Sequence, residues 1–504
     1  MAKHRRTQGL PALLAIVTLL IPLLAACGGS AATPSPTTGA QAQATSAAPA
    51  AAAPTAAAAP TAEAAPTAAA AEATAAPAAE PTAEGPQAQP TLVAAPNAVV
   101  LNYWDMQWGG PELMNQIQDN VTEFNRTHPE IFVNFQQLSW GDYTQKFLSA
   151  IQAGTPPDIG GGDSGIPFNM DAQGQALDIS DLYQEWQSSG AFDDMVPWAY
   201  QKWDYNGKHP GITWQFDIRA IFYRKDLLEQ AGLKPPTTWD ELLAAAKKLT
   251  TPDKSMIGIA VPGKQGSYDT DQFYMTLVLQ AGGMLADQNG KAAFDTPEQL
   301  KALEFEKQLV ECCAAPGTPS WTFTEVMKAF EQGQAAMAFG GGWFAGDIKK
   351  NAPDIFKNTG VLPVLIGPGG PKAQHSVAFA NPWMIYKQTK HPEEAKTFLK
   401  WMMQKENLLK LYAAEPGGKW PIYKSMLNDP IYKSDEVIAT LAKQVVENGV
   451  DYWYPYNKGA VGISSMGTGI TDIIVNPVIS GQRQPQDVLK DAQQQLGQVF
   501  VNQP

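Results

Sequence analysis

The sequence contains few combinations of residues that could carry out covalent chemistry. The most suggestive is the run Gly-Asp-Ser-Gly at 162–165, which has the order found around the serine nucleophile of some proteases. That chemistry needs a histidine base within hydrogen-bond distance of the serine hydroxyl. After residue 26, the one histidine upstream of Ser164 is His128, which stands in a Thr-His-Pro context typical of a helix end. We therefore reject a serine protease.

Metal and cofactor chemistry is also unsupported by the spacing of residues. The histidines after residue 26 are scattered without ligand spacing: His128, His209, His375 and His391. Asp269 and Asp271 lack the glycine turn and the terminal glutamate of a calcium loop. Glycine-rich segments do not have the spacing that cradles a phosphate. We expect no cofactor and no metal.

Two of the three cysteines are neighbours, Cys312 and Cys313, at the end of a predicted helix. The Cα atoms of bridged cysteines are usually farther apart than those of adjacent residues. We therefore expect two buried free thiols, with a strained disulfide between neighbours as the alternative.

The third cysteine, Cys27, has informative surroundings. Basic residues near the N-terminus are followed by an apolar run over 10–26, the small residues Ala25 and Ala26, and then Cys27. This order resembles a bacterial lipoprotein signal, which implies removal of residues 1–26 and lipidation of Cys27. An ordinary secretory signal with an incidental cysteine is the alternative. We expect a chain that is anchored through Cys27 at the extracytoplasmic face of the bacterial cell membrane.

Residues 27–97 have the composition of a tether. From residue 31 the segment is almost entirely Ala, Pro, Thr and Gln, and it contains no aromatic residue. Such a segment cannot bury enough apolar surface to offset the entropy lost on ordering, and its prolines interrupt helices. The sequence predicts a disordered spacer between the anchor and the rest of the chain.

The remaining segment, 98–504, is rich in aromatic residues, acidic, and longer than a single hydrophobic core usually accommodates. Removing residues 1–26 takes away three of the 36 basic residues and no acid, so the net charge changes from −13 to −16. A surface this acidic repels nucleic acid, and we expect no nucleic-acid partner. About 400 residues favour two lobes over a single core.

Short apolar runs alternate with amphipathic segments along 98–504. The patterns predict strands over 99–104, 131–135 and 218–224, and helices over 112–128, 143–153, 225–231, 239–249, 297–312, 323–333 and 392–403. Thr238 and Glu241 have the spacing of a capping box at the start of one helix. Alternation of this kind predicts α/β architecture with parallel sheets flanked by helices.

A set of short motifs occurs in order along this region. They are Phe-Asn-Arg-Thr-His-Pro (124–129), Ala-Gly-Thr-Pro-Pro-Asp-Ile (153–159), Phe-Tyr-Arg-Lys-Asp-Leu-Leu (222–228), Pro-Pro-Thr-Thr-Trp-Asp-Glu-Leu (235–242), Ala-Phe-Glu-Gln-Gly-Gln-Ala-Ala-Met (329–337), His-Pro-Glu-Glu-Ala (391–395), Ser-Gly (480–481) and Asp-Val-Leu (487–489). Together they resemble the extracytoplasmic solute-binding proteins of ABC importers, in the group that includes the maltodextrin-binding and other sugar-binding proteins.

The resemblance implies a two-lobed periplasmic-binding-protein-like fold, in which each lobe is a sheet flanked by helices and the ligand cleft lies between the lobes. It implies one lobe of 98–215 with 376–425 and another of 216–375 with 426–504. Crossing strands are expected near 211–221 and 376–385. The expected partners are a carbohydrate ligand, the permease subunits of an ABC transporter and, through the lipid anchor, the membrane; we expect a monomer without enzymatic activity.

A sugar offers an apolar C–H face for aromatic stacking and an edge of hydroxyls for polar side chains. The resemblance places both residue types at the cleft, and the predicted ligand-binding residues are Trp108, Asp163, Trp214, Asp217, Trp343 and Trp383. Core packing is the alternative for each tryptophan. Near the C-terminus the family often has a further aromatic residue, where this chain has Gly467-Thr468, so roles for Trp453 and Tyr454 stay open.

Two alternatives remain at this point. A secreted glycoside hydrolase would need two carboxylates across the cleft, for which Asp163 and Asp217 are the candidates. A binding protein for another solute, such as a glycerophosphodiester or a peptide, is the second alternative. A phosphate ligand would require a basic cleft, and Arg219 is the cation that the sequence places there.

Overall fold

The structure is a computed structural model that describes residues 92–140, 143–451 and 469–501. The chain divides into two units, Met1–Gln87 and Ala88–Pro504, and the described residues all belong to the second. The predicted leader, Cys27 and the tether up to residue 91 lie outside the described residues, as do Trp453, Tyr454 and Gly467-Thr468. Within the described part, no helix has the length and apolar character that a membrane crossing requires.

A mixed sheet organises the second unit. Its strands follow the order β2-β1-β3-β7-β4-β5, with β6 paired to β4 and β8 paired to β7. The strands are β1 (Val99–Met106), β2 (Ile131–Leu138), β3 (Ile159–Gly161), β4 (Ile212–Arg224), β5 (Met337–Gly341), β6 (Thr359–Val361), β7 (Ser376–Ile385) and β8 (Gly449–Val450). Pairing is parallel in β2-β1-β3 and in β7-β8, but antiparallel wherever β4 is involved and between β3 and β7. Among the described strands, the expectation of parallel sheets is therefore wrong for four of the seven strand pairs.

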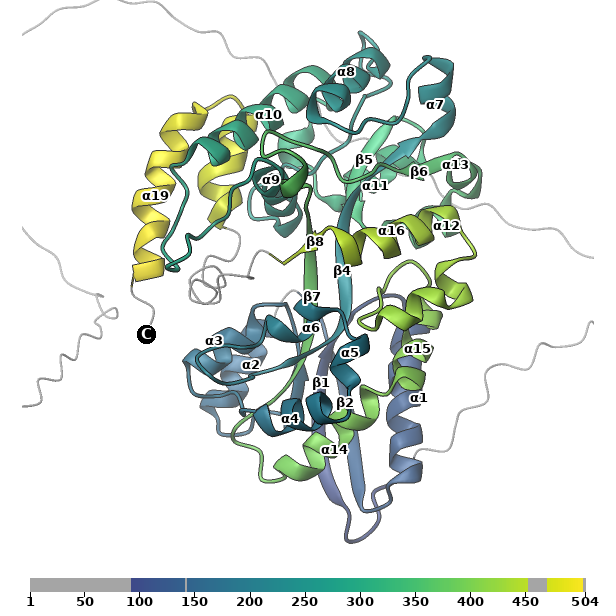
Figure 1. Ribbon diagram of the computed structural model, residues 1–504, viewed down its shortest axis with the longest axis vertical. Helices are drawn as coiled ribbons and strands as arrows, with labels where there is room; N and C mark the ends of the chain where they lie inside the picture. Colours follow the sequence, from purple (N-terminus) through teal and green to yellow (C-terminus); the bar gives the residue numbers. More distant parts are fainter. Residues whose placement is uncertain (1–91, 141–142, 452–468, 502–504) are drawn as a thin grey trace, which may run out of the picture. The chain divides into compact units, whose positions relative to one another are not determined.

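The antiparallel strands β4 and β7 are the long ones, and they run between two groups of helices (Figure 1). The first part of β4, Ile212 to Ile218, pairs with β7, and the second part pairs with β5 and β6. The strands β4 and β7 correspond to the two stretches, near 211–221 and 376–385, that are expected to cross between the lobes. A third segment joins them, because Trp420 and Phe216 exchange backbone hydrogen bonds of 3.0 and 3.2 Å.

The helices lie in two groups along this sheet (Figure 1). Around β1–β3 lie α1 (Pro111–Thr127), α2 (Tyr143–Gln152), α3 (Ile166–Ala172), α4 (Ser180–Ser188), α5 (Ala191–Asp194), α6 (Pro197–Gln201), α14 (Pro392–Met402) and α15 (Lys405–Ala414). The other group contains α7 (Lys225–Gln230), α8 (Trp239–Leu249), α9 (Tyr268–Gln280), α10 (Pro297–Cys313), α11 (Phe323–Glu331), α12 (Phe344–Asn351), α13 (Pro353–Lys357), α16 (Glu436–Glu447), α18 (Asn476–Ile479) and α19 (Pro485–Val501). Every predicted helix and strand is present, with ends shifted by at most six residues, the largest shift being the start of β4.

The capping prediction for α8 is half right. The Thr238 side chain accepts a hydrogen bond from the Glu241 N–H, as expected, but the Glu241 carboxylate accepts from the backbone and hydroxyl of Thr237 instead of closing on Thr238. A complete capping box occurs at α11, where Thr322 and Glu325 bond reciprocally. Both devices satisfy N–H groups that a helix start otherwise leaves free.

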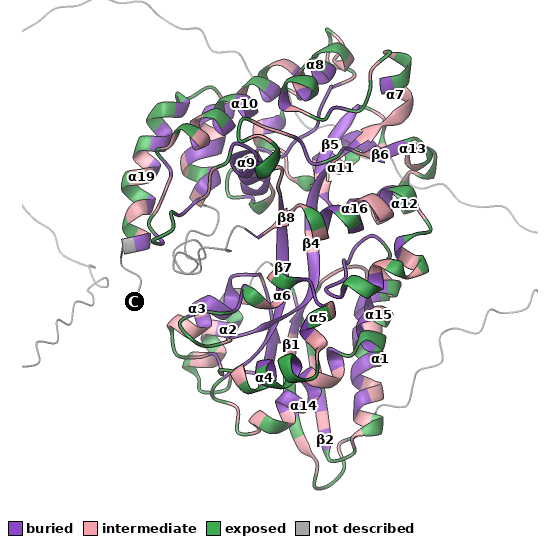
Figure 2. Ribbon diagram, in the orientation of Figure 1, coloured by how far each residue is buried: buried purple, intermediate pink, exposed green. Residues whose placement is uncertain are grey.

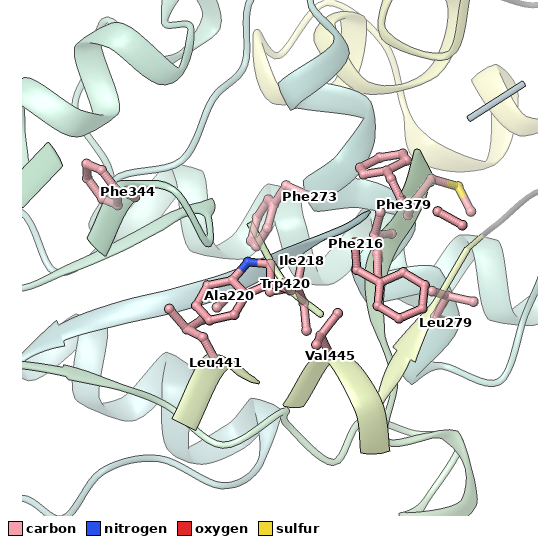
Figure 3. Packing of buried hydrophobic residues seen from close by; sticks show 14 of the residues in the cluster. Phe216, Ile218, Ala220, Phe273, Leu279, Phe344, Phe379, Trp420, Leu441 and Val445 are labelled. Atoms are coloured by element: carbon pink, nitrogen blue, oxygen red, sulfur yellow. The ribbon is translucent and has the colours of Figure 1, made fainter. Parts of the chain in front are cut away.

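Burial follows the sheet and the helix faces turned toward it (Figure 2). All ten residues of β7 are buried, and α9 is buried from Thr270 to its end, so neither shows the alternation of a half-exposed element. At the crossing, Phe216, Ile218 and Trp420 pack together with side chains of α9 and α16 (Figure 3). The crossing strands are thus held in a continuous apolar core.

Cys312 and Cys313 form a disulfide, so the expectation of two buried free thiols is wrong. The expectation relied on the usual Cα separation of bridged cysteines, whereas these Cα atoms are 3.7 Å apart, the ordinary spacing of consecutive residues. The pair lies in the last turn of α10, where the chain leaves the helix at Ala314. Cys313 is buried and Cys312 is partly exposed.

Candidate functional site

A cavity of about 360 Å³ lies beside the middle of β4 and β7. Segments from both helix groups line it, together with the two crossing strands. The lining residues are Trp108, Trp140, Tyr143, Asp163, Ser164, Gln215, Asp217, Arg219, Tyr268, Asp269, Gln272, Phe323, Trp343, Phe379, Asn381 and Lys419. Seven of the sixteen are aromatic, and the others carry carboxylate, amide, hydroxyl or cationic groups.

The structure separates the six predicted ligand-binding residues into two sets. Four of them line the cavity: Trp108, Asp163, Asp217 and Trp343. Trp214 and Trp383 do not line it; they are at most 1% exposed and stack face to face with ring centroids 4.9 Å apart. This stack lies directly behind Trp108, whose ring meets Trp214 edge to face at 5.6 Å.

Alternation along β4 accounts for this separation. Gln215, Asp217 and Arg219 point into the cavity, whereas Phe216 and Ile218 between them are fully buried in the core. Trp214 is the extra residue of a bulge, because Thr213 pairs with Pro382 and Gln215 pairs with the next residue, Asn381. The bulge and the alternation direct Trp214 away from the cavity.

Aromatic side chains stand at the mouth of the cavity with unusual exposure. Trp140, Tyr268 and Phe323 are 42%, 39% and 41% exposed, and they are the exposed large aromatic residues in the described part of the chain. Trp140 packs edge to face on Trp108, and Phe323 packs the same way on Trp343, with centroids 5.0 and 5.3 Å apart. Apolar rings left open to solvent and gathered at one place mark a binding surface.

The position of the Trp343 ring depends on a glycine. Trp343 follows β5 at the start of α12, and its indole folds back over Gly341. A Cβ atom on Gly341 would lie 2.1 Å from the Trp343 Nε1 atom, which no side chain can tolerate. Gly341 therefore makes room for the ring that faces the cavity.

Asp217 and Arg219 form an ion pair on the cavity wall, with Arg219 Nη1 and Asp217 Oδ2 2.7 Å apart. Arg219 also donates from Nε to the side-chain oxygen of Gln272, and its guanidinium lies 5.0 Å from the ring centre of Phe379. The cation is therefore neutralised, hydrogen-bonded and stacked before any ligand enters.

Asp163 is held in the loop after β3. Its carboxylate accepts from the Tyr143 hydroxyl and, at 2.7 Å, from the Gly165 N–H. The neighbouring Ser164 is buried, and within the described part of the chain its hydroxyl has no hydrogen-bond partner. His128, the base that a protease would require, instead stacks on Phe124 with centroids 4.2 Å apart.

Several buried polar atoms on the cavity wall have no partner among the described residues. They include Ser164 Oγ, Gln215 Oε1 and the second oxygen of Asp217, Oδ1. A buried polar atom without a partner costs roughly 1–3 kcal/mol. The wall is therefore predisposed to a ligand that brings hydroxyl or amine donors.

The remaining charged groups at the cavity are Asp269 and Lys419. Burial raises the pKa of Asp269, and the nearby Arg219 opposes that rise. Lys419 is 4% exposed and lies 3.2 Å from the Glu415 carboxylate. Both cavity cations thus have a carboxylate partner. Among the described residues, no group of three or more His, Cys, Asp or Glu side chains could hold a metal ion.

A second depression, of about 900 Å³, lies over α4 and α6. It is wide open to solvent, with Tyr183 and Phe192 in its floor and Gln184, Gln187 and Gln201 on its sides. Its few aromatic rings are largely covered, and it does not lie at the crossing strands. The smaller cavity combines exposed rings with unpaired polar atoms and is the better candidate site.

Sequence reasoning missed most of the cavity lining outside β4. Trp140, Tyr268, Phe323 and Lys419 come from loops and helix starts that meet through the fold, and local spacing does not reveal such meetings. One signal was available: strand alternation from Asp217 predicts Gln215 and Arg219 on the same face and places Trp214 on the other.

Comparisons with known proteins agree with this architecture. The family model described as "Bacterial extracellular solute-binding protein" matches residues 108–408. A putative ABC transporter periplasmic-binding protein of Escherichia coli, YcjN, is 26% identical over 411 residues, which cover 75% of this chain and 88% of the relative.

Solved structures also match. A sugar transporter protein of Arthrobacter chlorophenolicus with bound laminaribiose aligns with a TM-score of 0.68 at 22% identity, covering 79% of this chain and 99% of that one. An ABC transporter solute-binding protein of Agrobacterium radiobacter in complex with ribitol aligns with a TM-score of 0.67 at 25% identity, covering 81% and 100%. The fold is that of these binding proteins.

Proposed function

We propose a ligand class for this chain, which belongs to the bacterial extracellular solute-binding proteins of ABC transporters, a non-enzymatic family. The ligand is a neutral carbohydrate, captured in the cavity beside β4 and β7 and delivered to the permease subunits of an importer. Trp108, Asp163, Asp217 and Trp343 contact it. Trp214 and Trp383 act from behind as support.

The observation that carries the proposal is the combination of exposed rings and unpaired acceptors in one cavity. Trp140, Tyr268 and Phe323 offer apolar faces, while Gln215 Oε1 and Asp217 Oδ1 lack donors. A pyranose presents both counterparts, a face of C–H groups and an edge of hydroxyl donors. Relatives of the same fold have laminaribiose or ribitol bound, and both ligands are neutral and rich in hydroxyls.

Charge favours a neutral sugar over a glycerophosphodiester. Arg219 is paired with Asp217 and Lys419 with Glu415, so neither cation is available to a phosphate without breaking an ion pair. Asp163 and Asp269 add negative charge at the same wall. An anionic ligand would meet this charge inside a partly dehydrated cavity, where repulsion is strong.

We further propose that capture closes two lobes, 98–215 with 376–425 and 216–375 with 426–504, around the cavity. Lining residues on both sides of β4 and β7 support this division, since a hinge motion of either side would enclose the ligand. Cys27 would anchor the protein by its lipid, and the segment up to residue 97 would let the binding unit reach the permease.

Thermal unfolding of the full-length protein tests the ligand class. The panel contains monosaccharides, disaccharides, polyols, sugar phosphates and glycerophosphodiesters at matched ionic strength. A ligand at a hundredfold above its Kd stabilises the folded state by about 2.7 kcal/mol, which raises the midpoint measurably. We expect a neutral saccharide or polyol to raise it. A shift with phosphorylated ligands alone would contradict the proposal.

A variant that removes one charge from the cavity wall sharpens the same experiment. Asp217→Asn should weaken the binding of the neutral sugar, because it removes an acceptor, and should free Arg219 for an anion. We expect this variant to bind a sugar phosphate that the wild type does not bind. Equal binding of the neutral sugar by variant and wild type would remove Asp217 from the contact set.

A further inference from the structure

The end of β1 holds a carboxylate that does not line the cavity but is bonded to its wall. Asp105 is fully buried. Its Oδ1 atom accepts from the Met106 N–H at 2.8 Å and from the Trp108 Nε1–H at 2.6 Å. Its Oδ2 atom accepts from the Trp383 Nε1–H at 2.9 Å and from the Tyr103 hydroxyl. Four donors thus converge on two oxygens.

We propose that Asp105 is the positioning residue of the cavity wall: its carboxylate fixes the indole of Trp108 and ties it to Trp383 on the crossing strand β7. The orientation of the stacking surface is therefore set by a side chain that the ligand never touches. The inference rests on the proposed function only in that Trp108 is taken to contact the ligand.

The surroundings of Trp108 explain why such a link is needed. Trp108 lies in the loop between β1 and α1, so no regular hydrogen-bond ladder fixes its backbone. Its ring meets Trp140 and Trp214 edge to face, and such contacts contribute only modestly beyond the burial of area. A hydrogen bond to an ionised acceptor is directional and roughly twice as strong as a neutral one. It supplies the constraint that packing alone does not.

The neighbouring strand is shaped for this carboxylate. Gly161 of β3 lies against it, and a Cβ atom there would come within 2.1 Å of Asp105 Oδ1. Any side chain at Gly161 would displace the oxygen that holds Trp108. β3 and β7 therefore present a glycine and an indole donor to Asp105, and the site is built around the carboxylate.

The pKa of Asp105 lies closer to neutral pH than that of an ordinary aspartate. Burial raises its pKa to about 6, against the opposing effect of its hydrogen bonds to Tyr103, Trp383, Met106 and Trp108. Tyr103 is the titratable group that faces it. Burial, and secondarily Asp105 itself, hold the pKa of Tyr103 well above its usual value, so its hydroxyl remains a donor. Protonation of Asp105 makes it a weaker acceptor, and the hold on Trp108 loosens as the pH falls through about 6.

The direct test follows the Trp108 indole N–H by ¹H–¹⁵N NMR of the ligand-free, full-length protein, with the signal assigned by Trp108→Phe. In the wild type we expect the signal to move with pH, with a midpoint near 6. Asp105→Asn should abolish the transition. Tyr103→Phe should shift the midpoint to higher pH, because it removes a hydrogen bond that stabilises the charge. A Trp108 signal whose position and pH dependence are the same in Asp105→Asn and in the wild type overturns the proposal.

Affinity provides the second readout, with the neutral carbohydrate that gives the largest thermal shift in the panel. At pH 7.5 we expect Asp105→Asn to weaken binding about tenfold. Tyr103→Phe, which leaves the Trp108 bond intact, should remain within about twofold of the wild type by the same measure. Equal affinity of Asp105→Asn and the wild type contradicts the inference. The NMR arm needs no ligand, so failure of the carbohydrate proposal and failure of this one are distinguishable; if Asp105→Asn does not fold, the Tyr103→Phe midpoint still decides.

Discussion

Two pairs of tryptophans near the cavity differ in their exposure. Trp214 and Trp383 lie face to face inside the core and are at most 1% exposed. Trp108 and Trp343 line the cavity and remain partly exposed. Trp108 touches Trp214 edge to face, so a partly exposed ring packs directly on a fully buried one.

The two pairs differ in where the free energy of burying a ring is gained. The inner rings gain it on folding, because they leave water whether or not a ligand is present. The outer rings retain exposed surface, and a ligand that covers them gains the remainder. Truncation of an inner ring should therefore act on stability, and truncation of an outer ring on affinity.

The largest effect should come from Trp214→Ala. The substitution removes a fully buried ring and leaves a cavity beneath Trp108, so we expect the free energy of unfolding to fall by about 3–5 kcal/mol. Urea unfolding followed by circular dichroism measures the change. Trp343→Ala is the matched control and should lower it by less than about 1 kcal/mol. Similar losses in both variants would end the distinction between inner and outer rings.

The next effect concerns Asp105, which bonds to one ring of each pair. Its pKa is raised from the ordinary 3.8 to about 6, so the folded state binds a proton more tightly than the unfolded chain does. Its contribution to stability is therefore greatest at low pH and is lost as the pH rises from about 4 to about 6, by on the order of 2–3 kcal/mol.

The test is to measure the unfolding free energies of the wild type and of Asp105→Asn from pH 4 to pH 8. The wild-type value minus the variant value isolates the contribution of Asp105. The difference should fall between pH 4 and 6 and then stay level. A difference that is constant with pH would mean that Asp105 titrates alike in both states. Binding should follow the opposite trend, since the ionised carboxylate is the form that holds Trp108.

A smaller free energy is expected for Trp343, and it should appear in affinity. Trp343→Ala removes a lining ring, and we expect affinity for the carbohydrate to fall roughly tenfold to a hundredfold. Titration calorimetry measures this, with Trp343→Phe as a matched variant that keeps a stacking ring and should recover most of the loss. Unchanged affinity in the alanine variant would remove Trp343 from the contact set.

The smallest effect on affinity is expected for the aromatic residues at the mouth of the cavity. Trp140 is 42% exposed, so Trp140→Ala should leave the unfolding free energy unchanged and weaken affinity by less than about tenfold. A loss as large as that of Trp343→Ala would show that the ligand extends to the mouth of the cavity. Calorimetry on both variants with the same carbohydrate makes the comparison.

Local structure was largely predictable, and pairing between distant strands was not. The helix at 239–249 has its cap, its acidic first turn and its basic last turn written in adjacent residues, and α8 has those bounds. The antiparallel pairing of β4 with β7 joins segments far apart in sequence. Alternation of strands and helices predicted the parallel pairs β2-β1-β3, but it carries no information about the direction of the pairing between β4 and β7.

The site shows the same limit. Trp343 and Asp217 were assigned to the cleft through the family resemblance, and they line the cavity. Trp383 shares β7 with the lining residues Phe379 and Asn381, but it lies farther along the strand, where Trp214 covers it. Burial of that kind is a property of the assembled sheet and cannot be read from the residue type.

The position of β7 in the sheet also has a consequence for the order of assembly. β3 and β4 follow one another along the chain, but in the sheet β7 lies between them. During synthesis, which proceeds from the N-terminus, β3 and β4 must wait with open edges until everything from α7 to η2 (Pro371–Ala373) has emerged. Such late, non-local pairing is intrinsically slow and leaves strand edges open to wrong partners. A chaperone that shields β3 and β4 during this interval would therefore raise the yield of folded protein more than it would change the stability of the finished molecule.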